Sequence, residues 1–413
     1  MRISKKASVD AQASHTIDPS LTQSAVTLGD RALAALAVAS AVSVANGYYI
    51  QPLLVDIGSA FSIPSPLLGF LPALSQFGLA CGVVFLLPLG DVVSTRNLLM
   101  ALVPLQIAAL MMIFLSGQSG ILAAACLLVG VFGITPYVLA PYASLHAPPG
   151  RIGQVTGVLT RGVIIGILLA RAVAGVVGTH FGWRVVYGIA AATMLGVLFA
   201  LRSLVRPAPP VAQAEKGVRY SDLLRSLVHL VRTIPALRTA ALCQAFNFGS
   251  FNVFWLGSTL YLRSPQFGWT AEEVGLVAIV GAVAASAAPL FGRVADSKGP
   301  RATRRAALGC MSVAWLLLVV FRHCLAGMAV GLVLLDIGST VCDISNRTIL
   351  YRLEPEVRTR LNAIYMSAMF GGAALMSVLV GICWSAGGWI GICMLGLTSL
   401  VCALILTRSV DDA

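Results

Sequence analysis

The chain has 413 residues, of which 58% are hydrophobic and only 11% are charged, and its mean hydropathy is +0.89. A soluble domain of this length would expose many more charged side chains, so the composition argues against an ordinary soluble protein. The net charge of +12 is typical of proteins that bind nucleic acid or an anionic membrane surface. The positions of the basic residues decide between these two classes.

Apolar stretches of roughly 20 residues recur along the chain, each long enough to cross a hydrocarbon core ~30 Å thick as a helix. Residues 1–30 are polar and basic, and they predict a disordered tail rather than a cleaved signal. Residues 408–413 form a second short tail. The twelve predicted spans lie near 31–53, 67–90, 98–117, 120–143, 155–178, 185–203, 238–262, 272–294, 303–322, 325–347, 361–383 and 386–407.

The chain also repeats itself at about half its length. The paired landmarks are Asn46–Tyr49 with Asn252–Trp255, Pro148–Arg151 with Pro355–Arg358, and Asp91 with Asp296, at offsets of 206, 207 and 205 residues. A constant offset predicts two homologous six-helix bundles, residues 31–203 and 238–407, joined by a linker at 204–237. In membrane proteins, paired halves usually build a transporter with its site on the pseudosymmetry axis.

The first and seventh spans carry the repeated amide and aromatic side chains. Such groups need partners inside apolar helices, so they are predicted to line a hydrated cavity or to bond to one another. An aromatic cavity with few polar groups suits an amphiphilic or aromatic small molecule. Alternatively, Tyr48, Tyr49 and Trp255 form an aromatic belt at the membrane surface. The full set is Asn46, Tyr48, Tyr49, Gln51, Gln244, Asn247, Asn252 and Trp255.

The fourth and fifth spans add three candidates. Pro136 predicts a kink that lets Tyr137 line the same cavity. In the fifth span Arg171 is predicted to lock helices together, to bind an anionic substrate group or to pair with a buried acid in one access state. Arg161 is predicted either to reach the cytoplasmic surface or to contact substrate. Small residues recur every four positions in this span and predict close packing against another helix; they are Gly162, Gly166, Ala170 and Ala174.

The linker at 204–237 contains Pro207, Pro209 and Pro210 and the longest polar run between spans, and it predicts a short surface helix around residues 220–232. The loops predicted on the outer side hold only Arg184, Arg263 and Arg322, whereas the inner segments hold many more basic residues. This asymmetry predicts that both termini are cytoplasmic. The positive charge is therefore interpreted as an orientation signal with anionic-lipid contacts, which argues against nucleic-acid binding.

Among the acidic residues, only Asp336 and Asp343 lie well inside a predicted span. Seven residues apart, they share one face of the tenth helix, and Asn346 is predicted to extend that face. Because an apolar surrounding disfavours the charged form, either carboxylate could take up and release protons and so couple transport to a proton gradient. The alternatives are a permanent ion pair between helices or a carboxylate that caps a neighbouring helix.

Residues 292–301 read GRVADSKGPR and resemble the loop signature G-x-[LV]-A-D-x-x-G-x-[KR] of the major facilitator superfamily. The copy at residues 88–96, PLGDVVSTR, is degenerate. Further segments resemble a bacterial branch related to drug/proton antiporters and sugar-efflux permeases: 48–54, 166–175, 182–184, 334–338 and 360–365. The fifth span lacks the Gly-Pro of the antiporter signature, which weakens the prediction of export. The resemblance implies an all-α membrane fold of twelve helices that gives alternating access between two bundles.

The resemblance also implies an inner gate. Asp296 of the loop that starts at Gly292, and Asp91 of its first copy, are predicted to hold neighbouring helix ends and to pair with basic residues in one access state. The candidate partners are Arg151, Arg358 and Arg360. The alternative is that these carboxylates are solvated charges that only orient the chain.

These observations predict a secondary transporter, a proton-coupled exporter of a small organic molecule in a bacterial inner membrane. The alternatives are a symporter or facilitator for a sugar or organic acid, and a membrane sensor. The five histidines form no catalytic or metal-binding cluster with cysteines or acids, and no Walker loop occurs, so neither an enzyme, a metal site nor ATP-driven pumping is predicted. We expect a monomer whose partners are the substrate and the lipid bilayer, with no cofactor beyond the proton gradient.

Overall fold

The computed structural model describes residues 28–148, 150–206, 220–281, 299–353 and 357–411. Every regular element in these residues is a helix. The first half contains α1 (Asp30–Ala45), α2 (Ile50–Ala60), η2 (Ser65–Leu67), α3 (Phe70–Cys81), η3 (Gly82–Leu86), η4 (Leu87–Asp91), α4 (Thr95–Phe114), α5 (Ser119–Phe132), α6 (Thr135–Leu145), α7 (Ile152–Phe181) and α8 (Trp183–Leu204). The second half contains α9 (Tyr220–Thr233), α10 (Pro235–Leu262), α11 (Ala271–Leu276), α13 (Pro300–Val320), α14 (Leu325–Tyr351) and α15 (Arg358–Asp411).

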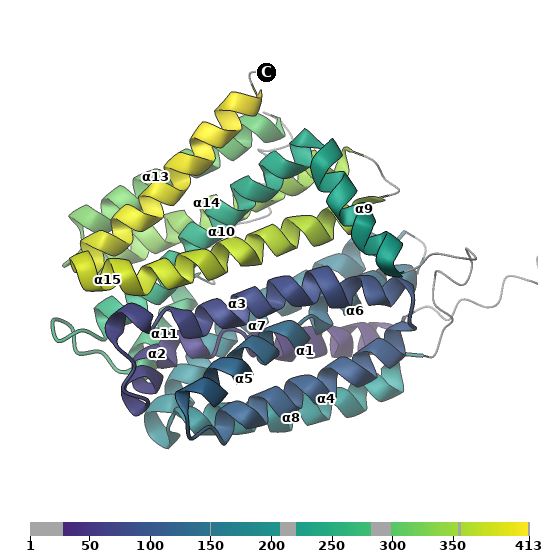
Figure 1. Cartoon of the computed structure of the whole chain (residues 1–413), viewed down its shortest axis with the longest axis horizontal. Helices are drawn as coiled ribbons and strands as arrows, with labels where there is room; N and C mark the ends of the chain where they lie inside the picture. Colours follow the sequence, from purple (N-terminus) through teal and green to yellow (C-terminus); the bar gives the residue numbers. More distant parts are fainter. Residues whose placement is uncertain (1–27, 149, 207–219, 282–298, 354–356, 412–413) are drawn as a thin grey trace, which may run out of the picture.

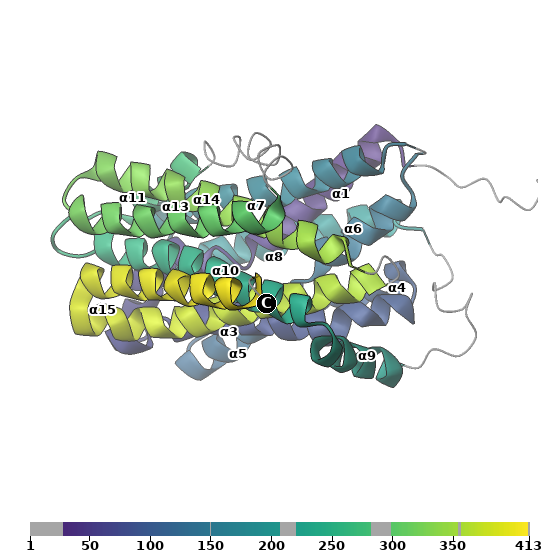
Figure 2. The same cartoon turned by 90° about the horizontal axis from the view of Figure 1, so that it is seen from above.

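The helices form two bundles whose axes run in roughly the same direction (Figure 1). The bundle of α1–α8 lies below the bundle of α10–α15 in that view, and α9 lies at one end of the molecule. The same end-to-end order is visible in the turned view (Figure 2). We call the two ends the α9 end and the α11 end, because α11 and α2 lie opposite α9.

Nine helical stretches of the described residues are long and apolar enough to cross a membrane. The last stretch, Arg358–Arg408, is 51 residues long and bends at Gly388, whose φ of 54° suits glycine, so it holds two of the predicted spans. The predicted seventh span is α10, and the predicted eighth lies mostly outside the described residues. The prediction of an all-α membrane fold is confirmed, and twelve spans agree with these helices.

Two spans of the first bundle are broken in the middle. The first span, predicted as one helix, divides into α1 and α2 at Asn46–Tyr49, where short-range bonds such as Tyr48 N to Ala45 O (2.9 Å) replace the α-helical pattern. The fourth divides into α5 and α6, where Gly133 N bonds Gly130 O at 3.0 Å and Pro136 stands in the first turn of α6. In contrast, α10 runs unbroken through the repeat-related residues Asn252–Trp255. The two halves therefore differ in backbone where their sequences match, and the second copy has Val253 in place of Gly47.

Close packing of small residues holds α7 against α1. A Cβ atom added to Gly166 would lie 2.4 Å from the backbone oxygen of Ala41, and one added to Gly162 would lie 2.7 Å from that of Ala37. Such spacing is possible only where glycine lets two backbones approach. The predicted ridge of small residues on this helix therefore packs against the first span.

Candidate functional site

A chain of buried polar side chains crosses the interface between the two bundles. Arg171 of α7 donates from Nε to Oε1 of Gln51 in α2 at 2.7 Å, and Nε2 of Gln51 donates to Oδ1 of Asn252 in α10 at 3.3 Å. The Nδ2 atom of Asn252 then donates to Oγ of Ser377 in α15 at 2.8 Å. All four side chains are at most 3% exposed. Buried hydrogen bonds of this kind connect both halves at a point far from water.

Two aromatic rings lie against the guanidinium group of Arg171. The Cζ atom of Arg171 lies 3.7 Å from the centroid of the Trp255 ring and 5.4 Å from that of the Tyr48 ring. A cation on an aromatic face is stabilised by the ring quadrupole, more strongly where water is excluded. The indole Nε1 of Trp255 is buried without a hydrogen-bond partner among the described residues. Arg171 therefore bonds Gln51 of its own bundle and lies over Trp255 of the other bundle.

The carboxylate of Asp336 lies beside this arginine. A Cβ atom added to Gly281 would lie 2.8 Å from Oδ2 of Asp336, 3.6 Å from the Trp255 ring and 3.5 Å from Leu168 of α7. Asp336 interacts electrostatically with Arg171, but it forms no ion pair within 4.0 Å with any residue that the structure describes. The predicted acid and the predicted cation therefore meet at the bundle interface without direct contact.

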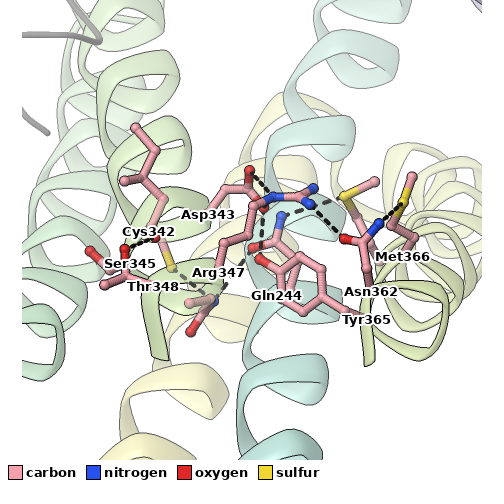
Figure 3. A network of polar contacts seen from close by, with 12 residues as sticks. Gln244, Cys342, Asp343, Ser345, Arg347, Thr348, Asn362, Tyr365 and Met366 are labelled. Atoms are coloured by element: carbon pink, nitrogen blue, oxygen red, sulfur yellow. Dashed lines mark hydrogen bonds and ion pairs between the residues drawn. The ribbon is translucent and has the colours of Figure 1, made fainter. Parts of the chain in front are cut away.

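Asp343 belongs to a separate network nearer the α9 end (Figure 3). Its carboxylate pairs with Arg347 at 2.9 Å within α14, and Tyr365 of α15 donates to it at 2.7 Å. Arg347 reaches on to Oδ1 of Asn362 at 2.8 Å and lies over the Tyr365 ring, 5.0 Å from its centroid. The side chains of Asp343 and Arg347 are 29% and 28% exposed. This carboxylate is neutralised by a neighbour one turn away, unlike Asp336.

Three predicted cavity residues lie inside the second bundle instead. Gln244 accepts a hydrogen bond from Asn247 at 3.0 Å and one from Asn346 at 3.5 Å, and Asn346 also accepts from Arg304 at 3.3 Å. Gln244, Asn247 and Asn346 are each at most 1% exposed. Asn346 therefore faces the interior of the second bundle, whereas the Asp343 carboxylate is partly exposed and bonds Arg347 and Tyr365.

The remaining predicted cavity residues occupy several environments. Tyr137 packs against Phe370 of the other bundle, with ring centroids 5.9 Å apart, and lies near Tyr48. Tyr49 packs within its own bundle against Tyr187, with centroids 6.4 Å apart. Asn46 is buried, and neither polar atom of its side chain has a partner among the described residues. Arg161 is exposed and bonds only the backbone of Gly157, so the structure does not bring it to the interface.

Contacts between the bundles also seal the α11 end. Asp56 of α2 forms an ion pair with Arg263, which follows α10, and His180 of α7 lies 3.0 Å from Glu272 of α11. Next to them α3 and α15 pack so closely that a Cβ atom added to Gly69 would lie 1.9 Å from the backbone oxygen of Ser377. These residues were not predicted from the sequence. The repeat could have indicated the pair of Asp56 with Arg263. These residues carry opposite charges and are 207 residues apart, which is close to the offset between the two halves.

The predicted gate residues that the structure describes lie at the α9 end but are not all brought together. Asp91 interacts electrostatically with Arg360. Arg151 instead pairs with Asp30 at 3.1 Å, and Arg358 donates to the backbone oxygen of Tyr351 at 2.9 Å. The pairing of Arg151 with Asp91 is therefore absent, because Asp30 at the start of α1 is its partner. Gly292 and Asp296 lie outside the described residues.

Two packed membrane bundles with a polar chain across their interface define a class of protein, the two-bundle membrane transporters. The chain belongs to the Major Facilitator Superfamily, whose family model matches residues 36–258 and 240–412. A relative named as an uncharacterized transporter, YgaY of Escherichia coli O157:H7, is 31% identical over 372 residues, which are 90% of this chain and 93% of the relative. A probable transporter of Streptomyces coelicolor, SCO4007, is 29% identical over 362 residues, covering 87% of this chain and 82% of the relative.

Solved structures share the fold. A bacterial homologue of the human lysosomal transporter Spinster, in an inward-facing and unoccupied conformation, has a TM-score of 0.67 and 15% identity, covering 92% of this chain and 94% of that chain. The POT family transporter PepTSo has a TM-score of 0.68 and 12% identity, covering 93% and 99%. At these identities the likeness concerns the fold alone.

Proposed function

We propose that this transporter couples the movement of protons to the export of a small organic molecule by alternating access. The observation that carries the proposal is the position of Asp336 beside Arg171 at the bundle interface. An ionised carboxylate in this apolar setting is stabilised by the arginine, whereas a protonated one removes that attraction. Proton binding at Asp336 therefore changes how strongly α14 is held to α7.

The aromatic surroundings support an amphiphilic or aromatic substrate. Tyr48 and Tyr137 of the first bundle and Trp255 and Phe370 of the second lie along the interface. Such rings offer apolar contact area, while Arg171 and the amides of Gln51 and Asn252 offer a few fixed polar groups. Export follows from the resemblance of residues 48–54 and 166–175 to the antiporter branch.

The orientation belongs to the same proposal. The α9 end, which carries the linker, faces the cytoplasm of a bacterial cell, the protein sits in the inner membrane as a monomer, and both termini are cytoplasmic. The ion pairs at the α11 end then close the outer side, and the partly exposed Asp343 and Arg347 lie on the inner side. The charge asymmetry of the loops supports this orientation.

The test uses proteoliposomes that enclose a pH-sensitive dye and receive a panel of amphiphilic aromatic compounds. The wild-type protein should move protons when a transported compound is added, and Asp336→Asn should abolish this while substrate exchange without a pH gradient persists. Asp222→Asn is the control, because it removes a carboxylate from the exposed surface of α9. If Asp336→Asn moved protons as the wild type does, Asp336 would not be the coupling residue.

The direction of transport needs a separate measurement. In inside-out vesicles with an acidic lumen, an exporter that exchanges protons accumulates its substrate. Accumulation that requires an alkaline lumen would establish symport and would overturn the proposal of export while leaving proton coupling intact.

A further inference from the structure

A groove lies between α4 and α8. These two helices are on the side of the first bundle that faces away from the second bundle (Figure 1). The volume of the groove is about 320 Å³, and it is lined by Arg96, Met100, Pro104, Leu198, Phe199 and Arg202. Arg96 stands in the first turn of α4 and Arg202 in the last turn of α8, so the two arginines occupy one end of the groove. The groove is therefore separate from the interface that contains Arg171 and Asp336.

The two ends of this groove differ chemically. Arg96 uses Nη2 to bond the backbone oxygen of Arg202 at 3.3 Å, which leaves other N–H groups of its guanidinium free. Neither arginine forms an ion pair with a carboxylate of the described residues. From this charged end the groove continues over Met100 to Pro104, roughly 12 Å along α4 at about 1.5 Å per residue. One wall there is Phe199, which is 64% exposed.

Apolar side chains continue this surface beyond the groove. Leu105 of α4 and Leu195 of α8 are both 46% exposed, as expected of residues that face lipid tails. Pro104 lies inside α4 and lacks a backbone N–H, so it presents only apolar ring atoms to the groove. The groove has a charged end at the membrane boundary and an apolar part that runs toward the membrane interior. These two parts match the headgroup and the acyl chains of a phospholipid.

We propose that the groove between α4 and α8 binds an anionic phospholipid, with its phosphate on Arg96 and Arg202 and an acyl chain along Met100, Pro104 and Phe199. Guanidinium groups bind phosphate oxygens in a planar, two-point geometry, and basic pockets between membrane helices attract anionic headgroups. The bound lipid links the beginning of α4 to the end of α8. A soluble phosphate ester lacks the chain and leaves the apolar part of the groove empty.

The test measures the binding of cardiolipin and of phosphatidylglycerol to the full-length protein in neutral detergent by native mass spectrometry. The double variant Arg96→Gln/Arg202→Gln should bind these lipids roughly 30-fold more weakly, since each basic residue near a membrane surface contributes a factor of about five. The matched control is Arg225→Gln/Arg232→Gln, which removes two arginines from the exposed surface of α9. This control should keep the wild-type affinity.

Three further measurements distinguish a lipid site from its alternatives. Met100→Trp fills the groove without changing its charge and should weaken lipid binding, while glycerol phosphate should not bind the wild type at the same concentration. The unfolding temperature should rise with anionic lipid in the wild type and the α9 control but not in Arg96→Gln/Arg202→Gln. Equal loss of lipid in both double variants would show that overall charge is responsible, and binding of glycerol phosphate would show a simple phosphate site; either result overturns the proposal.

Discussion

At the scale of single residues, Arg171 shows why arginine and lysine are not equivalent in this position. Its Nε donates to Gln51 while the plane of the guanidinium lies on the Trp255 ring. A lysine offers a single rotating ammonium group, which cannot stack and bond in two fixed directions at once. The planar cation therefore fixes the distance between α7 and α10, which belong to different bundles.

We expect Arg171→Lys to reduce substrate-driven proton movement severely and to lower the free energy of unfolding by about 1.5–3 kcal/mol, the value of a hydrogen bond to a charged group. Arg184→Lys is the matched control, because Arg184 lies over Trp183 at 4.3 Å and bonds the backbone of Ser116 within the first bundle only. Arg184→Lys should keep transport near the wild-type rate. Transport assays and unfolding in detergent measure both effects, and equal transport in the two variants would contradict the role given to Arg171.

At the scale of helices, the contact between α1 and α7 depends on glycine at defined positions. Gly166 and Gly162 let the α7 backbone approach Ala41 and Ala37. The break between α1 and α2 lies just beyond this contact. Gln51, in the first turn of α2, bonds Asn252 across the interface between the bundles.

Gly166→Ala should destabilise the protein by about 1–3 kcal/mol, because the added methyl group would overlap the Ala41 carbonyl and force the helices apart. Gly196→Ala offers a matched control on α8, since nothing lies within 4 Å of an added Cβ atom there. This control should gain up to about 1 kcal/mol from its better helix propensity. Thermal unfolding of both variants in one detergent gives the comparison, and a neutral Gly166→Ala would show that the contact tolerates expansion.

At the scale of the whole molecule, an ion pair and close backbone packing hold the bundles together at the α11 end. The ion pair of Asp56 and Arg263 and the packing of Gly69 against Ser377 both connect one half to the other. The transport cycle must break these contacts to open that end. Their strength therefore influences how readily the α11 end opens.

We expect Asp56→Arg to favour opening of the α11 end, because it places like charges against each other, and Asp56→Arg/Arg263→Asp to restore closure. The readout is the rate at which a membrane-impermeant maleimide modifies Ser377→Cys, a buried position, in a background without native cysteines. The single variant should react several-fold faster than the double variant. Equal rates would mean that the pair does not hold this end closed.

The general architecture was predictable from composition, span length and the repeat, because the membrane leaves few alternatives for an apolar chain of this length. The closeness of Asp336 and Arg171 could not be derived, since it depends on how α7 and α14 rotate about their axes. The pairing of Asp343 with Arg347 was available from their four-residue spacing but was not predicted. The break at Asn46–Tyr49 was also missed. Its sequence copy at Asn252–Trp255 remains helical, so the shared residue pattern does not determine the backbone at these positions.

That broken helix has a consequence for kinetics. Only the first half possesses a joint at this position, so the inward-open and outward-open forms are not mirror images of each other. We expect the two switching steps to depend unequally on this joint, because only one bundle contains it. Substitutions that stiffen the joint should then slow one half-cycle more than the other.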